Sequence, residues 1–98
     1  MLRLSIDAQG DIRDAAHWYE QQQTGLGVEF VEEIDAAFSR IDAGEFRYPV
    51  TYRNLRRALV RRFSYAVYFD AASPGNVLIV AVLHQRRDKA ILDERFGR

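Results

Sequence analysis

The sequence predicts an α+β fold, in which an antiparallel hairpin of two N-terminal helices packs on a small antiparallel β-sheet and a short helix closes the chain. Two observations predict this arrangement. Apolar residues recur with helical spacing in the first half, and the second half changes to the alternating and β-branched runs that are typical of strands. The chain has 98 residues, enough for one domain and too few for two, so we expect residues 1–98 to form a single domain.

Two helices are predicted in the first half. Leu2–Ile6 alternates apolar with polar residues and is expected to be a short opening strand, and Asp7 is a suitable N-cap for the helix that follows. We expect that helix over residues 8–22 and a second helix over residues 28–43, each with one apolar stripe. The Thr-Gly-Leu-Gly segment at 24–27 permits a tight reversal, so the two helices should run antiparallel.

Side chains on these helices indicate how they face the rest of the protein. Trp18 and Tyr19 are expected to anchor the hairpin to the sheet, because large aromatic rings dominate the energetics of a core. Acidic residues cover the outside of the second helix, and we interpret them as a solvated face. They are Glu29, Glu32, Glu33 and Asp35.

The second half contains the predicted strands. Residues 46–54 include a proline and are interpreted as an irregular connection with room for a short extended piece. Three strands are expected, over residues 56–62, 64–70 and 77–83, with a turn at 71–76. The last strand is continuously apolar and β-branched, which predicts a central position buried on both faces. Residues 89–96 are expected to form the short terminal helix.

Opposite charges are divided between the two halves of the chain. Residues 1–45 hold three basic and ten acidic residues, a net charge of −7, whereas residues 46–98 hold eleven basic and four acidic residues, a net charge of +7. Thirteen of the fourteen basic residues are arginine, whose planar guanidinium binds phosphate or carboxylate through two parallel hydrogen bonds. The second half is therefore expected to bind an anionic partner.

The arginines form two clusters, which we predict to bind a target molecule or a phosphate group. Four lie in the predicted strand 56–62 and two follow the central strand; they are Arg56, Arg57, Arg61, Arg62, Arg86 and Arg87. On a strand, Arg57 and Arg61 would share one face and Arg56 and Arg62 the other. The alternative is that these charges only protect an edge strand from aggregation.

His84 is the one residue of the basic half that is suited to proton transfer near neutral pH. It directly follows the predicted central strand, which would hold it rigidly. The alternative, which the residue types alone favour, is that His84 hydrogen-bonds the loop after the strand while Asp88 caps the last helix.

Several classes of function lack their usual residues. The chain has no cysteine, and its two histidines do not have the spacing of metal ligands, so we expect neither a metal site nor a cofactor. No apolar stretch approaches the roughly 20 residues that span a bilayer, and the N-terminus turns polar at once. We expect a cytoplasmic protein with no membrane partner.

The order of these segments resembles the toxins of the RelE/ParE superfamily of type II toxin–antitoxin systems, and most closely the ParE branch. The resemblance covers nearly the whole chain. The matching segments are Ala8 to Ala16 leading into Trp18-Tyr19-Glu20, Gly25-Leu26-Gly27 before Phe30, Tyr48-Pro49, the run from Arg56 to Phe69, and Ile79 to His84 followed by Arg86-Arg87-Asp88.

This resemblance implies the helical hairpin on a sheet, and a small antitoxin that wraps and neutralises the toxin in a hetero-oligomer. It also implies one of two activities. RelE-like members cut mRNA on the ribosome, whereas ParE-like members are generally taken to poison DNA gyrase without catalysing a reaction.

Departures from the nuclease pattern favour the ParE-like interpretation. RelE-like nucleases use a lysine- and arginine-rich sheet and commonly a tyrosine near the C-terminus, and here the sheet has no lysine and residues 95–98 have no tyrosine. A ribonuclease would have to use His84 as acid or base, with Arg57, Arg62 and Arg87 around the scissile phosphate. A third possibility is an inactive relative that only binds its antitoxin.

Overall fold

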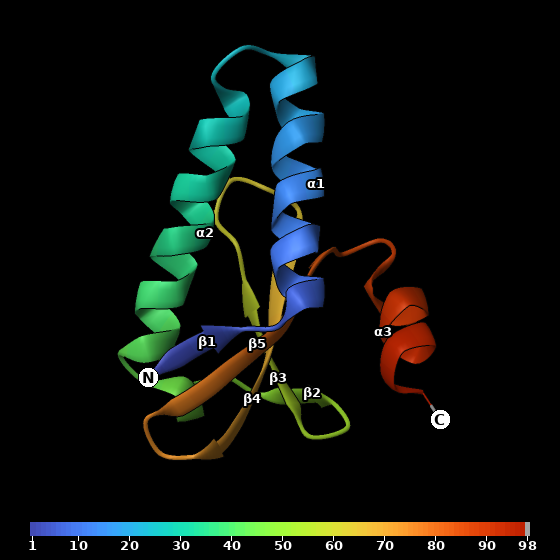
Figure 1. The fold of residues 1–98 in the computed structure, drawn as a ribbon. Helices are drawn as coiled ribbons and strands as arrows, with labels where there is room; N and C mark the ends of the chain where they lie inside the picture. Colours follow the sequence, from blue (N-terminus) through green and yellow to red (C-terminus); the bar gives the residue numbers. More distant parts are fainter. Residues whose placement is uncertain (98) are drawn as a thin grey trace.

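The computed structural model describes residues 1–97, in which two helices form a hairpin on one face of a five-stranded sheet and a third helix lies to the side (Figure 1). The elements are β1 (Leu2–Leu4), α1 (Ile6–Gln22), α2 (Leu26–Asp42), the 3-10 turn η1 (Glu45–Arg47), β2 (Val50–Tyr52), β3 (Leu55–Leu59), β4 (Tyr65–Ser73), β5 (Asn76–His84) and α3 (Asp88–Phe96). This confirms the predicted α+β class and the helical hairpin.

The sheet is mixed, whereas the sequence predicts an antiparallel one. Its strand order is β1-β5-β4-β3-β2. Strands β2 to β5 form an antiparallel meander, but β1 pairs parallel with β5, with Leu2 opposite Val77 and Leu4 opposite Ile79. Two parallel neighbouring strands need a long connection. Here α1, α2 and strands β2 to β4 lie between β1 and β5 in the sequence.

Alternation along the strands divides the apolar residues into two cores. On β4, Tyr65, Val67 and Phe69 face the helical hairpin while Ala66 and Tyr68 face the opposite side, as predicted. The larger core lies between the hairpin and the sheet and includes the buried residues Phe30, Ile34, Ile41, Val67, Phe69 and Ile79. The smaller core lies beneath α3 and comprises Leu55, Ala66, Tyr68, Val80, Ala81, Leu83 and Leu92. Strand β5 contributes to both, which confirms that it is buried on both faces, and it lies second in the strand order.

A bulge in β5 changes which of its residues face α1. Tyr68 pairs with Ala81, but the next residue, Phe69, pairs with Ile79, so Val80 has no partner in the ladder. Val80 and Ala81 therefore both face the smaller core, and the alternation is reversed beyond them. This reversal directs the backbone N–H of Val82 away from β4 and toward α1.

The start of α1 corrects the predicted cap. The helix begins at Ile6, and Ser5 is its N-cap, because the Ser5 hydroxyl accepts a hydrogen bond of 3.1 Å from the backbone N–H of Ala8. Asp7 lies instead in the first turn, where a negative charge interacts favourably with the helix dipole.

The reversal between α1 and α2 depends on Glu20 and two glycines. The Glu20 carboxylate accepts hydrogen bonds from the backbone N–H groups of Gly25 (2.9 Å) and Gly27 (3.0 Å). Gly25 has a φ of 90°, a left-handed conformation that glycine adopts without strain. A Cβ atom at Gly27 would lie 2.6 Å from the carbonyl oxygen of Ala16, so only glycine lets the helices approach this closely.

Trp18 does not anchor the hairpin, contrary to expectation, but Tyr19 does. The Tyr19 ring packs against the rings of Phe30 and Phe63, with centroids 5.2 Å and 4.8 Å away. Trp18 is 54% exposed. Tyr19 continues the inward stripe of α1, whereas Trp18 lies about 100° around the helix and faces outward.

Two strand boundaries also differ from the prediction. Strand β3 ends at Leu59 rather than at residue 62, because the chain leaves the sheet and Arg62 adopts a left-handed φ of 72°. The predicted turn at 71–76 is only Pro74-Gly75, since β4 continues to Ser73 and β5 begins at Asn76. Alternation therefore does not carry Arg61 and Arg62 onto the two faces of a strand.

Replacing Ile34 with alanine should destabilise the larger core. Ile34 is 1% exposed on α2, and its truncation leaves a cavity that its neighbours fill only in part. We expect the free energy of unfolding to fall by about 2 to 5 kcal/mol, measured by urea denaturation. Glu32→Ala, on the exposed side of the same helix, should change it by less than about 0.5 kcal/mol; equal effects of the two changes would contradict this account of the core.

Candidate functional site

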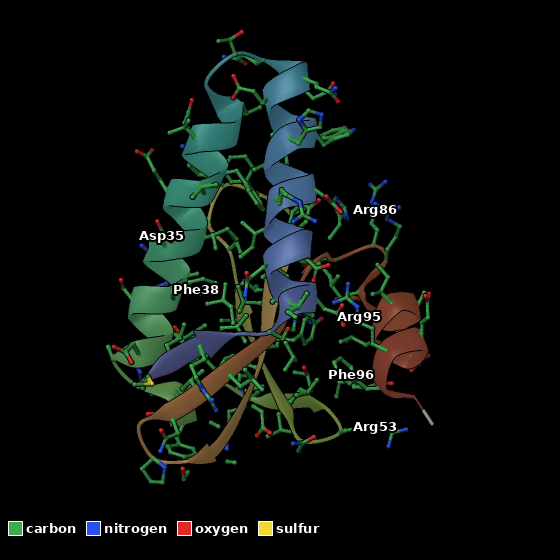
Figure 2. All side chains as sticks on the ribbon, in the orientation of Figure 1. Asp35, Phe38, Arg53, Arg86, Arg95 and Phe96 are labelled. Carbon is green, nitrogen blue, oxygen red and sulfur yellow. The ribbon has the colours of Figure 1, made fainter. Side chains whose placement is uncertain are left out.

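Asp11 on α1 connects three elements that are distant in sequence. Its Oδ2 accepts a hydrogen bond of 3.0 Å from the backbone N–H of Val82 on β5. The guanidinium of Arg95 on α3 donates two more, Nη1 to Oδ2 at 2.8 Å and Nη2 to Oδ1 at 2.6 Å. The Asp11 side chain is only 10% exposed, and these hydrogen bonds raise the pKa of Arg95. In Figure 2, Arg95 lies between α3 and α1.

The sequence did not reveal this contact. Asp11 lies off the apolar stripe of α1, which indicated an exposed residue, and Arg95 is 84 positions away. The residue types alone carry no sign that they meet, because the bulge at Val80 and the path of α3 are both features of the folded chain.

A groove of about 720 Å³ lies beside this contact. One wall is α1, the floor is the end of β5, and the other wall is the β5–α3 loop with the start of α3. Its lining residues are Asp11, Asp14, Ala15, Trp18, Tyr19, Tyr65, Val82, Leu83, His84, Arg86, Arg87 and Ile91. We call it the α1–α3 groove.

His84 lies on the floor of the α1–α3 groove. Its Nδ1 accepts a hydrogen bond of 3.1 Å from the backbone N–H of Arg86, and its ring contacts Tyr65 edge-on, with centroids 5.4 Å apart. The neutral ring that accepts this bond carries its proton on Nε2. The hydrogen bond between His84 and the loop is therefore present, as the alternative expected.

Asp88 does not cap α3 in the expected way. The N-cap position is Arg87, which makes no side-chain capping bond, and Asp88 is the first helical residue. Its carboxylate instead accepts a hydrogen bond from the Tyr68 hydroxyl and one of 2.7 Å from the backbone N–H of Lys89. Burial, followed by the bond to Asp88, raises the pKa of Tyr68.

Two of the six predicted arginines bind the backbone or a neutral side chain. Arg56 donates to the carbonyl oxygen of Tyr48 at 2.6 Å, and its guanidinium lies 5.0 Å from the ring centroid of Phe46. Arg57 donates from Nη2 to Oε1 of Gln85 at 3.3 Å. Its Nε is buried and has no hydrogen-bond partner among residues 1–97. Both arginines thus contribute to the packing of the sheet.

Arg62 is held by the acidic helix. It contacts Glu29 at 2.7 Å and Glu33 at 3.9 Å, and the hydrogen bond to Glu29 is the main reason that the pKa of Arg62 is raised. The acidic face of α2 is therefore not only a solvated face, because these two glutamates contact Arg62. In Figure 2, Asp35 points outward from the same helix.

Arg61, Arg86 and Arg87 are exposed, and within residues 1–97 their side chains make no hydrogen bond or ion pair. They lie in two loops at the same end of the sheet, residues 60–64 and 85–87, which we call the basic loops. A hydrogen bond of 2.9 Å from the backbone N–H of Gln85 to the carbonyl oxygen of Ser64 joins these loops. Of the six predicted arginines, the three that remain available to a partner therefore lie at one end of the sheet and not on a strand face.

The residues that RNA cleavage would require do not converge. Arg57 pairs with Tyr68 and His84 pairs with Tyr65, and these two tyrosines point to opposite faces of the sheet. Arg62 is engaged by α2. Of the four residues named for a nuclease, only His84 and Arg87 line the same groove.

Comparison with protein families gives a match over residues 2–89 to the family described as ParE toxin of type II toxin-antitoxin system, parDE. The chain belongs to the ParE toxin family. A solved structure, described as the chromosomal ParDE TA system from P. aeruginosa, has the same fold. It superposes with a TM-score of 0.74 and 13% sequence identity, covering 85% of this chain and 92% of that chain. Among curated proteins, no sequence match was found.

Two further observations concern this ParE-family chain as a whole. In the part that the structure describes, no helix is both long and apolar enough to cross a membrane. Within the same residues, no group of three or more histidine, cysteine, aspartate or glutamate side chains is arranged to hold a metal ion.

Removing the Asp11 carboxylate should destabilise the fold and loosen α3. Asp11→Ala leaves the Val82 N–H and the partly buried Arg95 without their acceptor, and we expect a loss of about 2 to 3 kcal/mol in the free energy of unfolding. A double-mutant cycle with Arg95→Ala should give a coupling energy above about 1 kcal/mol. Additive effects of the two changes would show that the contact contributes little.

The attachment of α3 should weaken in acid through Asp93. Its carboxylate accepts hydrogen bonds from the Tyr52 hydroxyl (2.6 Å) and the Lys89 ammonium (2.9 Å), and these lower its pKa from the usual 3.8. A lowered folded-state pKa means that the stabilisation is complete above the unfolded-state pKa and is lost as the pH falls through the folded-state value.

We therefore expect Asp93→Asn to be less stable than the wild type at pH 7 and equally stable in acid below the folded-state pKa of Asp93, as measured by urea denaturation across this range. Tyr52→Phe should reduce the difference at neutral pH. A difference between wild type and Asp93→Asn that persists unchanged into strong acid would contradict this role of Asp93.

Proposed function

We propose that this chain is the toxin of a type II toxin–antitoxin pair, that it inhibits DNA gyrase by binding rather than by catalysis, and that a cognate antitoxin neutralises it. Membership of the ParE toxin family supports the first part. The target and the neutralisation are inferred from the same resemblance together with the surface of this chain.

The observation that favours a binding function is the state of the six predicted arginines. Three are engaged within the protein, and Arg61, Arg86 and Arg87 remain exposed in the basic loops. Exposed arginines with no internal partner keep all five N–H donors for carboxylates or phosphates of another molecule. We assign contact with the target to these three residues.

The nuclease alternative would need several groups around one phosphate. An acid or base and neighbouring cations must lie within hydrogen-bond reach of the reacting oxygens. Because Arg57 and His84 face opposite sides of the sheet and Arg62 is paired with Glu29, the described residues offer only His84 and Arg87 at one place. This geometry favours the gyrase interpretation over the nuclease one.

Purified protein should inhibit the supercoiling of relaxed plasmid by gyrase and should leave mRNA intact in a translating ribosome assay. Arg86→Glu/Arg87→Glu, which reverses two exposed charges, should raise the concentration for half-inhibition by about tenfold or more. Arg61→Glu should act in the same direction. Arg3→Glu, an exposed charge on β1 at the other end of β5, is the matched control and should inhibit as the wild type does.

The alternatives predict different results. Ribosome-dependent cleavage that His84→Ala abolishes without unfolding the protein would replace the gyrase proposal with the nuclease one. Neither inhibition nor cleavage, with continued growth of cells that express the chain alone, would leave an inactive relative that binds only its antitoxin. Pulse labelling after induction should show DNA synthesis stopping before protein synthesis.

A further inference from the structure

The α1–α3 groove has the size and lining of a site for a small molecule. Its volume of about 720 Å³ lies within the range of about 300 to 1,000 Å³ that is usual for such sites. Ala15, Val82, Leu83 and Ile91 provide apolar surface. Small-molecule sites are mostly apolar and contain a few polar groups that orient the ligand, so the polar groups of the groove indicate which ligand it can hold.

The one tryptophan of the chain lines the groove with an open ring face. Trp18 is 54% exposed, and its ring meets that of Tyr19 edge-on, with centroids 5.1 Å apart and an angle of 81° between the rings. This contact covers at most one face of the indole, so the other face is left for a flat ring. Stacking on an aromatic side chain is a common contact of nucleobases with proteins.

A carboxylate lies one helical turn before Trp18. Asp14 is four positions earlier on α1 and lines the same groove, so the two side chains are neighbours on one face of the helix. Asp14 is 81% exposed and contacts Arg13 at 3.7 Å, and an ion pair this exposed is weak and leaves the carboxylate accessible. An ionised carboxylate only accepts hydrogen bonds, so it selects a ring edge that carries donors. Guanine presents two adjacent donors, its N1–H and its N2 amino group.

The opposite wall of the groove is positively charged. Arg86 and Arg87 lie in the loop before α3, and within residues 1–97 neither side chain forms an ion pair. In Figure 2, Arg86 rises from this loop beside α1. Guanidinium groups bind phosphate through parallel hydrogen bonds, so two adjacent arginines suit two linked phosphates. Because Asp14 makes the other wall negative, the ligand that fits carries its negative charge at one end only.

Neutral polar groups also line the groove. Burial raises the pKa of Tyr19 and of Tyr65, and no hydrogen bond contributes to either shift, so both hydroxyls are protonated at neutral pH. His84 accepts a hydrogen bond at Nδ1 from the backbone N–H of Arg86, which leaves its Nε2–H as a donor. Groups of this kind suit the hydroxyls of a sugar, which both donate and accept hydrogen bonds.

We propose that the α1–α3 groove binds a guanine nucleoside diphosphate. The guanine ring stacks on Trp18 and donates from N1–H and the N2 amino group to Asp14. The two phosphates bind Arg86 and Arg87, and the ribose lies between the walls. Binding of the nucleotide does not depend on the proposed function, but one consequence does. A bound nucleotide covers two of the three arginines assigned to gyrase, so it reduces the inhibition of gyrase.

The single tryptophan makes binding in the groove directly observable. The wild type is labelled with 5-fluorotryptophan and titrated with guanosine diphosphate, and we expect its ¹⁹F resonance to shift and to saturate. In unlabelled protein, Trp18→Ala and Arg86→Glu/Arg87→Glu should each weaken the affinity by about tenfold or more, measured by calorimetry. Arg3→Glu and Val28→Ala, on exposed residues of β1 and α2, should bind as the wild type does.

The choice of base tests the role of Asp14. Adenosine diphosphate should bind about tenfold or more weakly than guanosine diphosphate, because the adenine N1 is an acceptor that would face the carboxylate. Asp14→Asn keeps the size of the side chain and adds a donor. It should lose affinity for guanosine diphosphate and gain affinity for xanthosine diphosphate, which has a carbonyl where guanine has its amino group. A merely structural role of Asp14 would not exchange this preference.

Supercoiling assays separate this proposal from the proposed function. Trp18→Ala and Asp14→Asn should inhibit gyrase as the wild type does, because neither residue is assigned to the target. Guanosine diphosphate should relieve the inhibition by the wild type and not that by Trp18→Ala. Reactions without the toxin control for an effect of the nucleotide on gyrase itself, and circular dichroism checks that every variant is folded.

The opposite results overturn the inference in identifiable ways. No ¹⁹F shift at millimolar guanosine diphosphate would overturn it, whether or not the protein inhibits gyrase. Equal affinity for inorganic pyrophosphate would show that the arginines bind any polyanion, and equal affinity for adenosine diphosphate would remove the role of Asp14. Binding that leaves the inhibition of gyrase unchanged would overturn the predicted competition. Binding of the nucleotide by a protein that never inhibits gyrase would overturn the proposed function and leave the nucleotide site standing.

Discussion

The carboxylate of Asp11 is the constraint on which the rest of this structure depends. A sheet edge that loses its neighbouring strand exposes backbone groups, and β5 loses β1 after Ile79. Asp11 takes the place of the missing strand at Val82 and also accepts two hydrogen bonds from Arg95. One side chain of α1 thereby fixes the bulged end of β5 and the position of α3. Because the contact lies between α1 and α3, it also determines the separation of the two walls of the groove.

The periodicity of apolar residues was sufficient to predict the elements in which buried positions recur at regular intervals. The stripe of α2, with Ile34 and Ile41 at its centre, and the alternation of Tyr65, Val67 and Phe69 on β4 are each specified by local sequence, and both agree with the structure. Features that depend on contacts between distant residues could not be predicted in this way. The parallel pairing of β1, the bulge at Val80 and the ion pair between Asp11 and Arg95 are not encoded in any short window. The end of β3 at Leu59 could not be predicted in this way either, because the Glu29 that pairs with Arg62 lies on α2.

The arginines show why composition overestimates a binding surface. A net charge of +7 over residues 46–98 indicated a broad basic face. In the fold, Arg56 donates a hydrogen bond to the carbonyl oxygen of Tyr48, and Arg57 donates one to the side chain of Gln85. Arg62 forms an ion pair with Glu29 in the acidic half of the chain. Part of the charge asymmetry is therefore internal, since one half of the sequence provides counter-charges for the other. Of the six arginines predicted to bind, those that remain for a partner are local, because Arg61, Arg86 and Arg87 share one end of the sheet.

This localisation limits what charge alone can specify. Exposed arginines attract an anionic partner whichever it is, so charge alone does not distinguish antitoxin from target. Discrimination requires an additional contact that only one of them makes. Trp18 and the end of β5 line the same groove as Arg86 and Arg87, whereas Arg61 lies in the other basic loop and does not line the groove. A partner that contacts the groove together with Arg86 and Arg87 would gain affinity from apolar burial as well as from charge, and it would cover two of the three arginines that the proposed gyrase contact uses.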